Sequence, residues 1–246
     1  MKFLKYPFHI LHRTWFYIMV TLSLLVLAPL FLVTLAKESW YSAFFWLARK
    51  WGTFVLFSCG FLPLMKDGFF HEKGKSFVFV ANHTSMLDIM LMLYTVKNPF
   101  VFVGKKELAK MPVFGFFYKR SCILVDRGDA DSRKAVFAAA QARIDQGLSI
   151  CIFPEGGITY KGTLLDPFKT GAFRLAINHQ LPIVPLVFPD NKKRFEWKFF
   201  SGSLGKTRSY ILKTFEVNQL ELKDKNKLKE NIRQLIYNKL VAEGAV

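Results

Sequence analysis

The sequence predicts an α/β domain with a mostly parallel central sheet flanked by helices, preceded by a membrane-associated helical hairpin. Short β-prone apolar runs alternate with helical segments from residue 66 onward, which is typical of a parallel sheet. Polar turns follow several of these runs directly. Residues 1–65 are instead rich in apolar and aromatic side chains. We therefore expect a membrane-anchoring hairpin over residues 1–65 and the α/β domain over residues 66–246.

The first apolar segment, residues 14–36, contains no charged residue. As a helix it would rise about 34 Å, enough to cross a hydrocarbon layer of about 30 Å. A cleaved signal peptide is disfavoured, because the run contains Pro29 and is followed by Lys37-Glu38-Ser39-Trp40 instead of a small-residue cleavage site. We therefore expect this segment to contact a membrane.

The second apolar segment, residues 40–65, is interrupted by Arg49 and Lys50 and contains Pro63. Its many aromatic residues, with basic side chains able to reach the headgroups, suit a helix in the membrane interface. Basic residues near the N-terminus favour a cytoplasmic start. We expect a hairpin that either crosses twice or enters only one leaflet, with both ends on the cytoplasmic face.

Charge and cysteine usage narrow the class of protein. The chain carries 35 Lys and Arg against 18 Asp and Glu, a formal net charge of +17. An anionic partner is expected, and nucleic acid, acidic lipid and phosphorylated substrates all qualify. Cys59, Cys122 and Cys151 lie in apolar segments without CxxC spacing. We expect reduced, buried thiols, no disulfide and no metal site, as on the cytosolic side of a membrane.

The elements of the α/β domain follow from the hydrophobic pattern. Buried strands are predicted at residues 77–81, 99–103, 123–125, 148–153 and 183–188, with an edge strand at 210–217. Helices are predicted from Asp88, at 132–146 and 168–180, and as an amphipathic C-terminal helix within 220–241.

A candidate catalytic pair follows the first buried strand. The polar turn Asn82-His83-Thr84-Ser85 comes directly after it, and Asp88 opens the next helix. His83 would lie at the carboxyl end of the strand, where open α/β sheets place their ligands. The Asp88 carboxylate could accept a hydrogen bond from one ring nitrogen and leave the other free to take a proton from a substrate hydroxyl. Taken alone, the pattern more often marks a turn histidine and a helix-start aspartate than a catalytic pair.

Three further polar stretches end predicted strands, so in a parallel sheet they converge on the same edge as His83. They are Lys105-Lys106-Glu107-Leu108, Val125-Asp126-Arg127-Gly128 and Phe153-Pro154-Glu155-Gly156-Gly157. Lys105 and Arg127 could neutralise a phosphate, and Arg127 could do so with two parallel hydrogen bonds. The N–H groups of Gly156 and Gly157 could face a phosphate or a developing oxyanion. Taken singly, a Lys or Arg is more often a solvated charge, and Pro-Glu-Gly-Gly is more often only a turn.

These stretches resemble the signatures of the glycerolipid acyltransferase family. NHTSMLD, Asn82 to Asp88, is similar to the family's Asn-His signature, in which Asp follows after four residues. The other similar stretches are KKEL at 105–108, CILVDR at 122–127, FPEG at 153–156, FKTGA at 168–172 and LPIVPL at 181–186. The resemblance runs from about residue 76 to 190 in the family's order, and is strongest to its bacterial 1-acylglycerol-3-phosphate acyltransferases.

The resemblance implies transfer of a fatty acyl group from acyl carrier protein or coenzyme A to the 2-hydroxyl of lysophosphatidic acid, giving phosphatidic acid. It implies His83 as the base and Asp88 as its partner, with direct attack on the thioester. It places Asn82, Lys105, Arg127, Glu155, Gly156, Gly157 and Lys169 in the substrate-binding region. No cofactor, metal or nucleic-acid partner is implied, only the two substrates and the bilayer.

One departure from the family pattern affects the acceptor. Family members commonly follow Glu-Gly with Thr-Arg-Ser, whereas here Gly157-Ile158-Thr159 stands, so an arginine expected to hold phosphate is missing. Either Lys105, Arg127 and Lys161 or Lys169 suffice, or the acceptor is another lysolipid, such as an amino-acid lysolipid without phosphate.

Two other classes remain as alternatives. A hydrolase needs a nucleophile, and neither Ser85 nor Cys151 lies in a nucleophile-elbow pattern. A nucleic-acid-binding or structural membrane protein would account for the charge but leaves the motifs unexplained.

Overall fold

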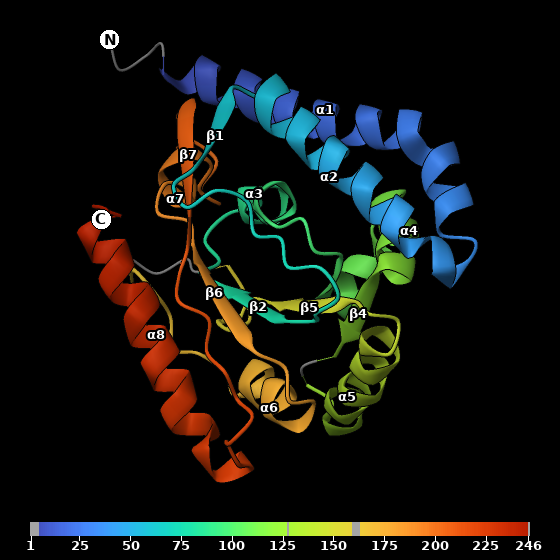
Figure 1. The fold of residues 1–246 in the computed structure, drawn as a ribbon. Helices are drawn as coiled ribbons and strands as arrows, with labels where there is room; N and C mark the ends of the chain where they lie inside the picture. Colours follow the sequence, from blue (N-terminus) through green and yellow to red (C-terminus); the bar gives the residue numbers. More distant parts are fainter. Residues whose placement is uncertain (1–4, 127, 159–162, 246) are drawn as a thin grey trace.

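The computed structural model describes residues 5–126, 128–158 and 163–245 (Figure 1). Its centre is a seven-stranded sheet in the order β1-β7-β6-β2-β5-β3-β4, with helices packed on both faces. The predicted α/β class and mostly parallel sheet are therefore confirmed.

Five neighbouring strands in this sheet run parallel. They are β6 (Ile183–Val187), β2 (Val78–Ala81), β5 (Ser149–Ile152), β3 (Phe100–Lys105) and β4 (Cys122–Val125). The residues of β2 and β6 are buried without alternation, because helices cover the sheet on both sides. The parallel order places the carboxyl ends of β2, β5, β3 and β4 side by side at one edge.

The helices divide between the two faces of the sheet (Figure 1). One face carries α1 (Lys5–Thr34), α2 (Tyr41–Ser58), α3 (Leu87–Thr95) and α4 (Phe114–Ser121). The other carries α5 (Ala130–Ile144), α6 (Gly171–Asn178) and α8 (Lys225–Ala242). Short elements complete the chain: η1 (Glu38–Trp40), η2 (Lys106–Lys110), α7 (Asn191–Arg194) and η3 (Leu222–Asp224). Helix α8 buries Leu228, Ile232, Ile236 and Leu240, as its amphipathic pattern predicts.

Strands β1 (Phe61–Met65) and β7 (Gly205–Ile211) correct the sequence analysis. Residues 61–65 were expected within the hairpin and an edge strand at 210–217. Instead, β7 begins at Gly205, runs antiparallel to β6 and carries β1 parallel on its other side, so it is an interior strand. Pro63 is tolerated in β1 because this outermost strand has a strand neighbour on one side only.

Helix α2 packs along the domain instead of standing apart from it. Its buried face includes Phe45, whose ring meets Phe100 of β3 edge-on with centroids 4.9 Å apart. Arg49 donates hydrogen bonds to the carbonyls of Leu93 and Tyr94 at the end of α3, a favourable place for a cation. Arg49, which interrupts the apolar run in the sequence, therefore attaches α2 to the α/β domain.

Among the described helices, α1 is the one long and apolar enough to cross a membrane by length and composition, over Tyr6–Thr34. Only 22% of its most apolar stretch is buried, so most of its side chains face outward. The division of the chain at residue 65 stays a prediction, and the structure adds that α2 and β1 pack against the elements that follow.

The three cysteines are free, with Cys59 and Cys151 buried and Cys122 partly buried. Burial raises the pKa of the Cys122 thiol to about 12 and that of Cys151 well above its usual range. Neither thiol has the low pKa of a reactive nucleophile.

Candidate active site

His83 and Asp88 are in direct contact at the carboxyl end of β2. Asp88 lies in the first turn of α3, and its Oδ2 is 2.9 Å from Nδ1 of His83. The His83 ring stacks on Phe153, which directly follows β5, with centroids 4.2 Å apart and planes inclined by 17°. The two neighbouring strands therefore place the imidazole between a carboxylate and an aromatic ring.

The buried Asp88 carboxylate receives hydrogen bonds on both oxygens. The N–H groups of Thr84 and Ser85 donate to Oδ2 over 2.7 and 2.9 Å. The side-chain amide of Asn191, in α7, donates to Oδ1 over 2.7 Å. The Asp88 side chain is 0% exposed. These donors and His83 together offset the free-energy cost of burying its negative charge.

This network assigns the tautomer of His83. The carboxylate only accepts hydrogen bonds, so Nδ1 of a neutral ring carries the proton and Nε2 offers its lone pair. Within the described part of the chain, no residue forms a hydrogen bond with Nε2 of His83. The ring therefore presents a base whose orientation is fixed through the opposite nitrogen.

Glu155 and Asn82, both in the predicted substrate-binding set, have side chains bound to backbone. Oε1 of Glu155 accepts from the His83 N–H over 2.6 Å, and Oε2 accepts from the Asp166 N–H over 2.9 Å. Asn82 accepts from the Phe188 N–H over 2.8 Å and donates to the Phe188 carbonyl over 3.0 Å. Both are buried and hold the backbone around His83 in place.

Gly156 and Gly157 differ in backbone conformation and in surroundings, which the sequence did not indicate. Gly156 has φ +82° and donates its N–H to the Phe153 carbonyl over 3.1 Å, so the expectation that this N–H faces an oxyanion is wrong. This hydrogen bond closes the tight turn after β5. A Cβ on Gly157 would meet none of the described residues within 4 Å.

The predicted phosphate-binding cations lie on different elements. Lys169 is exposed, and a Cβ on Gly156 would lie 2.8 Å from its Nζ, so its ammonium covers the turn after β5. Lys105 is exposed at the end of β3. Arg127 and Lys161 lie outside the described residues.

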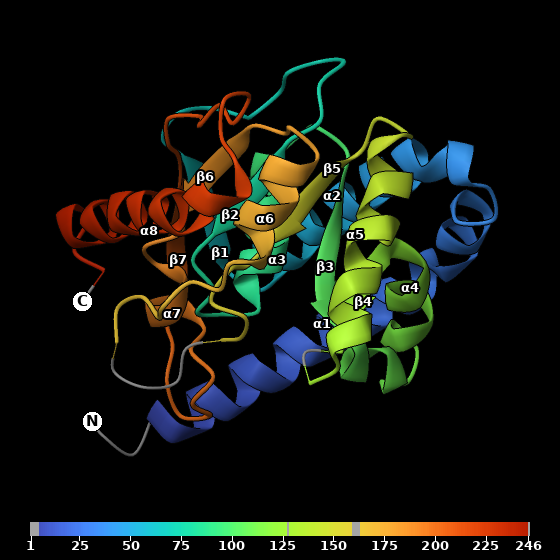
Figure 2. The same cartoon turned by 90° about the horizontal axis from the view of Figure 1, so that it is seen from below.

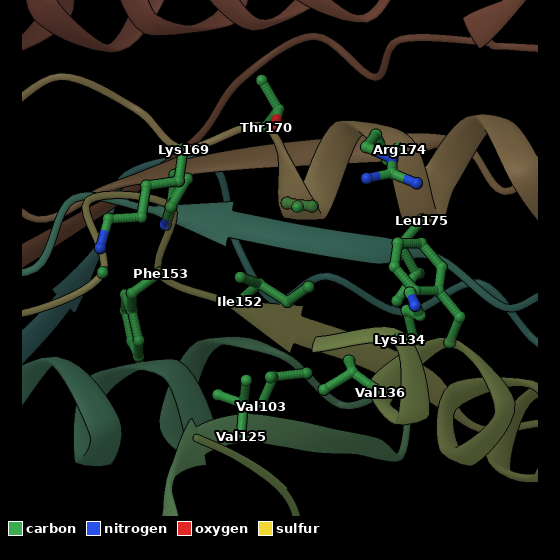
Figure 3. A pocket seen from close by; sticks show the side chains of 15 residues that line it. Val103, Val125, Lys134, Val136, Ile152, Phe153, Lys169, Thr170, Arg174 and Leu175 are labelled. Carbon is green, nitrogen blue, oxygen red and sulfur yellow. The ribbon is translucent and has the colours of Figure 1, made fainter. Parts of the chain in front are cut away.

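A groove of about 650 Å³ leads away from this site between α5 and α6 (Figure 3). Its apolar lining comes from Val103, Val125, Val136, Phe137, Ile152, Phe153, Ala172 and Leu175. Figure 3 shows Phe153 and Lys169 towards one end and Lys134 and Arg174 towards the other. Phe153 both lines the groove and stacks on His83, so the groove begins beside the base.

Sequence reasoning missed Asn191, the groove and the stacking of His83 on Phe153. Asn191 is 103 positions from Asp88 and sits in a four-residue helix without a motif that would single it out. Phe153 was part of a recognised motif, but its contact with His83 depends on β2 and β5 being neighbours.

A buried carboxylate, an imidazole oriented by it and an adjoining apolar groove thus lie together at the carboxyl edge of the sheet. The chain matches the family model described as Acyltransferase over residues 69–189. It belongs to the acyltransferase family that includes the 1-acyl-sn-glycerol-3-phosphate acyltransferases.

Named relatives come from bacteria and animals. A 1-acyl-sn-glycerol-3-phosphate acyltransferase of Helicobacter pylori is 32% identical over 160 residues, covering 65% of this chain and 67% of that protein. The Haemophilus influenzae enzyme of that name is 38% identical over 112 residues, covering 45% and 46%. The human alpha form is 36% identical over 136 residues, covering 52% and 47%. The matched segment thus spans about half the length of the last two.

The fold also matches a solved structure. The crystal structure of the 1-acyl-sn-glycerophosphate acyltransferase PlsC from Thermotoga maritima superimposes with a TM-score of 0.80. The match covers 100% of this chain and 99% of that one at 18% sequence identity. The shared architecture includes the N-terminal helices as well as the α/β domain.

Proposed function

We propose that the protein transfers a fatty acyl group from a thioester to the sn-2 hydroxyl of 1-acyl-sn-glycerol-3-phosphate, giving phosphatidic acid. The observation that carries this proposal is the His83–Asp88 contact beside the groove, in a chain whose relatives bear the name of this activity. The thioester is a co-substrate, acyl carrier protein or coenzyme A, and no resident cofactor takes part.

The reaction is a direct acyl transfer. Nε2 of His83 takes the proton of the acceptor hydroxyl as its oxygen attacks the thioester carbonyl. A C–O bond forms, the C–S bond breaks, and the proton passes to the leaving thiolate. Ser85 and Cys151 do not act as nucleophiles, because the Ser85 hydroxyl donates to the Phe195 carbonyl over 2.7 Å and the Cys151 thiol is buried.

The apolar groove supplies space for a hydrocarbon chain. Its lining is made of Val, Ile, Leu, Phe and Ala side chains, and it begins at Phe153. We place the acyl chain of the donor there, so that its carbonyl lies near His83. Burial of the chain would contribute about 0.8 kcal/mol per methylene group.

The acceptor phosphate is assigned to the cations around the strand ends. Lys169 lies over the turn after β5, Lys105 is the last residue of β3, and Arg127 follows β4 in the sequence. Ile158 stands at the position where the family resemblance leads us to expect an arginine, so we assign the recognition of phosphate to these three residues. The alternative acceptor is a lysolipid without phosphate.

We propose that the protein associates with a membrane through α1, which is long and apolar enough to enter a bilayer. We propose that α1 and α2 enter one leaflet from the cytoplasmic face. The packing of α2 on α3 and β3 supports this arrangement over two crossings, because a crossing would pull Arg49 from the carbonyls at the end of α3.

An acceptor competition assay tests the proposed function. Purified protein receives a labelled acyl thioester together with equal amounts of lysophosphatidic acid and a monoacyl lysolipid that lacks phosphate. Labelled phosphatidic acid should be the main product. Preferential labelling of the phosphate-free lipid would overturn the assigned acceptor, and transfer to neither would overturn the acyltransferase mechanism.

A further inference from the structure

The segment between α7 and β7, residues 196–204, exposes a cluster of large apolar side chains. We name it the aromatic loop. Its outward side chains are Trp197, Phe199, Phe200 and Leu204, which are 47%, 49%, 54% and 46% exposed. An exposed apolar patch of this kind marks an interaction surface in proteins that are otherwise soluble.

The aromatic loop is held in place by Arg13 of α1. The Arg13 guanidinium donates to the carbonyls of Glu196, Lys198 and Ser201. It also lies 5.6 Å from the ring centroid of Phe199, within cation–π range. Arg13 is only 3% exposed, so this cation is committed to the loop backbone. The apolar side chains consequently point outward from a fixed backbone.

The apolar surface of the loop continues onto α1. The Phe200 ring meets the Tyr6 ring edge-on with centroids 5.2 Å apart. On α1 the exposed side chains nearby in sequence include Leu11 and Trp15, at 69% and 46%. Figure 2 shows the loop after α7 reaching the N-terminal half of α1, on the side towards which β3 points. The loop therefore extends the surface of the helix assigned to the membrane.

The composition of the loop fits the boundary between headgroups and acyl chains. Trp and Phe favour that depth, and lysine side chains can reach from it to lipid phosphates. Lys193, Lys198 and Lys206 are exposed within and beside the loop. Glu196 is the acid among them, and it pairs with Lys198 at 3.9 Å. The surface is thus apolar in the middle and cationic around it.

We propose that the aromatic loop is a second membrane-contact element, which inserts into the headgroup region of an anionic bilayer beside α1. The partner is the lipid surface, since the loop continues the outward face of a helix long and apolar enough to enter a bilayer. The attraction of these lysines to an anionic surface would add to the burial of the aromatic rings.

The loop is also joined to the active site. Phe195, the residue before the loop, accepts a hydrogen bond from the Ser85 hydroxyl over 2.7 Å, two residues from His83. Contact of the loop with lipid would therefore fix how deep the turn at residues 82–85, which carries His83, lies relative to the lipid headgroups. This part of the inference rests on the proposed function, because it explains how an acceptor embedded in the bilayer reaches His83.

Solvent access to position 199 in a bilayer tests the inference without any turnover. Phe199→Cys, labelled with a small environment-sensitive dye, is reconstituted as the full chain into phosphatidylcholine–phosphatidylglycerol vesicles. The control is the same dye on Val241→Cys of α8, a site that is 50% exposed on the other side of the sheet. Iodide should quench the dye at 199 several-fold less than the dye at 241. Equal quenching at the two positions would overturn the proposal.

A kinetic comparison tests the link to the active site. Trp197, Phe199 and Phe200 are replaced together by Ser, and Leu222, Tyr237 and Val241 are replaced by Ser as the matched control. The loop variant should lose about tenfold in kcat/KM with lysophosphatidic acid embedded in vesicles, and keep its activity with a short-chain, monomeric acceptor. The control should lose neither. Equal losses on both acceptors, or none on vesicles, would overturn the link, whereas absence of turnover in the unmodified protein would overturn only the proposed function.

Discussion

Asn191 donates a hydrogen bond from its side-chain amide to Oδ1 of Asp88 over 2.7 Å, opposite the oxygen that contacts His83. The carboxylate is thus held on one side by α7 and on the other by the imidazole. Because α7 directly precedes the aromatic loop, one short helix supports both the catalytic pair and the proposed lipid contact. Asn191 is a positioning residue, since it acts on the base through Asp88.

Asn191→Ala is expected to lower kcat about tenfold to a hundredfold while KM changes little. The substitution removes one donor from a buried carboxylate, and the misplaced carboxylate would orient His83 less well. Steady-state kinetics with both substrates checks this, with Asn226→Ala, at an exposed asparagine of α8, as the control. A rise in KM at constant kcat would instead assign Asn191 to substrate binding.

His83→Ala is expected to lower kcat by about a thousandfold or more, because the variant has no base at the acceptor hydroxyl. Its far-ultraviolet circular dichroism and vesicle binding should match those of the unmodified protein, since the His83 side chain is not part of the core. Transfer at an undiminished rate in a folded variant would remove His83 from the mechanism.

Gly156→Ala is expected to reduce both stability and activity. At φ +82° an alanine is strained by about 1–2 kcal/mol, and its methyl group would lie 2.8 Å from the end of Lys169, which must then move. Gly157→Ala is the matched control, since its methyl group would meet none of the described residues within 4 Å. Thermal unfolding and KM for the phosphate-bearing acceptor measure the two effects. Equal melting temperatures and equal KM values for the two variants would mean that the turn at Gly156 does not set the position of the Lys169 side chain.

Asp190→Asn should make stability less dependent on acid pH. Burial alone would raise the pKa of Asp190, but hydrogen bonds and charge from Arg208 outweigh it and hold the pKa below its usual range. A depressed pKa contributes stability above the unfolded value, near pH 4, and that stability is lost as pH falls through the folded value. The variant should be less stable by about 2 kcal/mol at pH 7, with the difference shrinking towards pH 3. A constant difference across this range would contradict the assignment.

The sequence predicted the parts of the structure in which local pattern and topology agree. The strand–turn–helix around His83 was predicted because a buried apolar run, a polar turn and a helix-start acid occur together within residues 77–93. The contact of His83 with Asp88 follows from that local geometry. The strands that carry the other motifs are neighbours with their carboxyl ends at one edge, as a parallel sheet requires.

Other features depend on contacts between distant segments. Strand β1 looked like the end of an apolar helix because Phe-Leu-Pro-Leu-Met lacks alternation, and its partner β7 lies more than 100 residues on. The Gly156 N–H was a candidate ligand donor because Pro-Glu-Gly-Gly indicates a turn but does not show which N–H closes it. Asn191 and the Ser85–Phe195 hydrogen bond join segments over 100 residues apart, beyond the reach of any local pattern.

The place of β1 in the sheet has a practical consequence for shortened forms of this protein. Cutting the chain after Met65, to obtain the catalytic domain without its apolar helices, would strip β7 of the neighbour that pairs with Gly205–Ser209. The bare backbone of β7 would then be a template for other molecules, and the face of α3 covered by α2 would lie open. Such a fragment should self-associate, so a soluble version needs to begin upstream of Tyr41, which keeps both α2 and β1, and to carry polar substitutions at the exposed apolar side chains of α2.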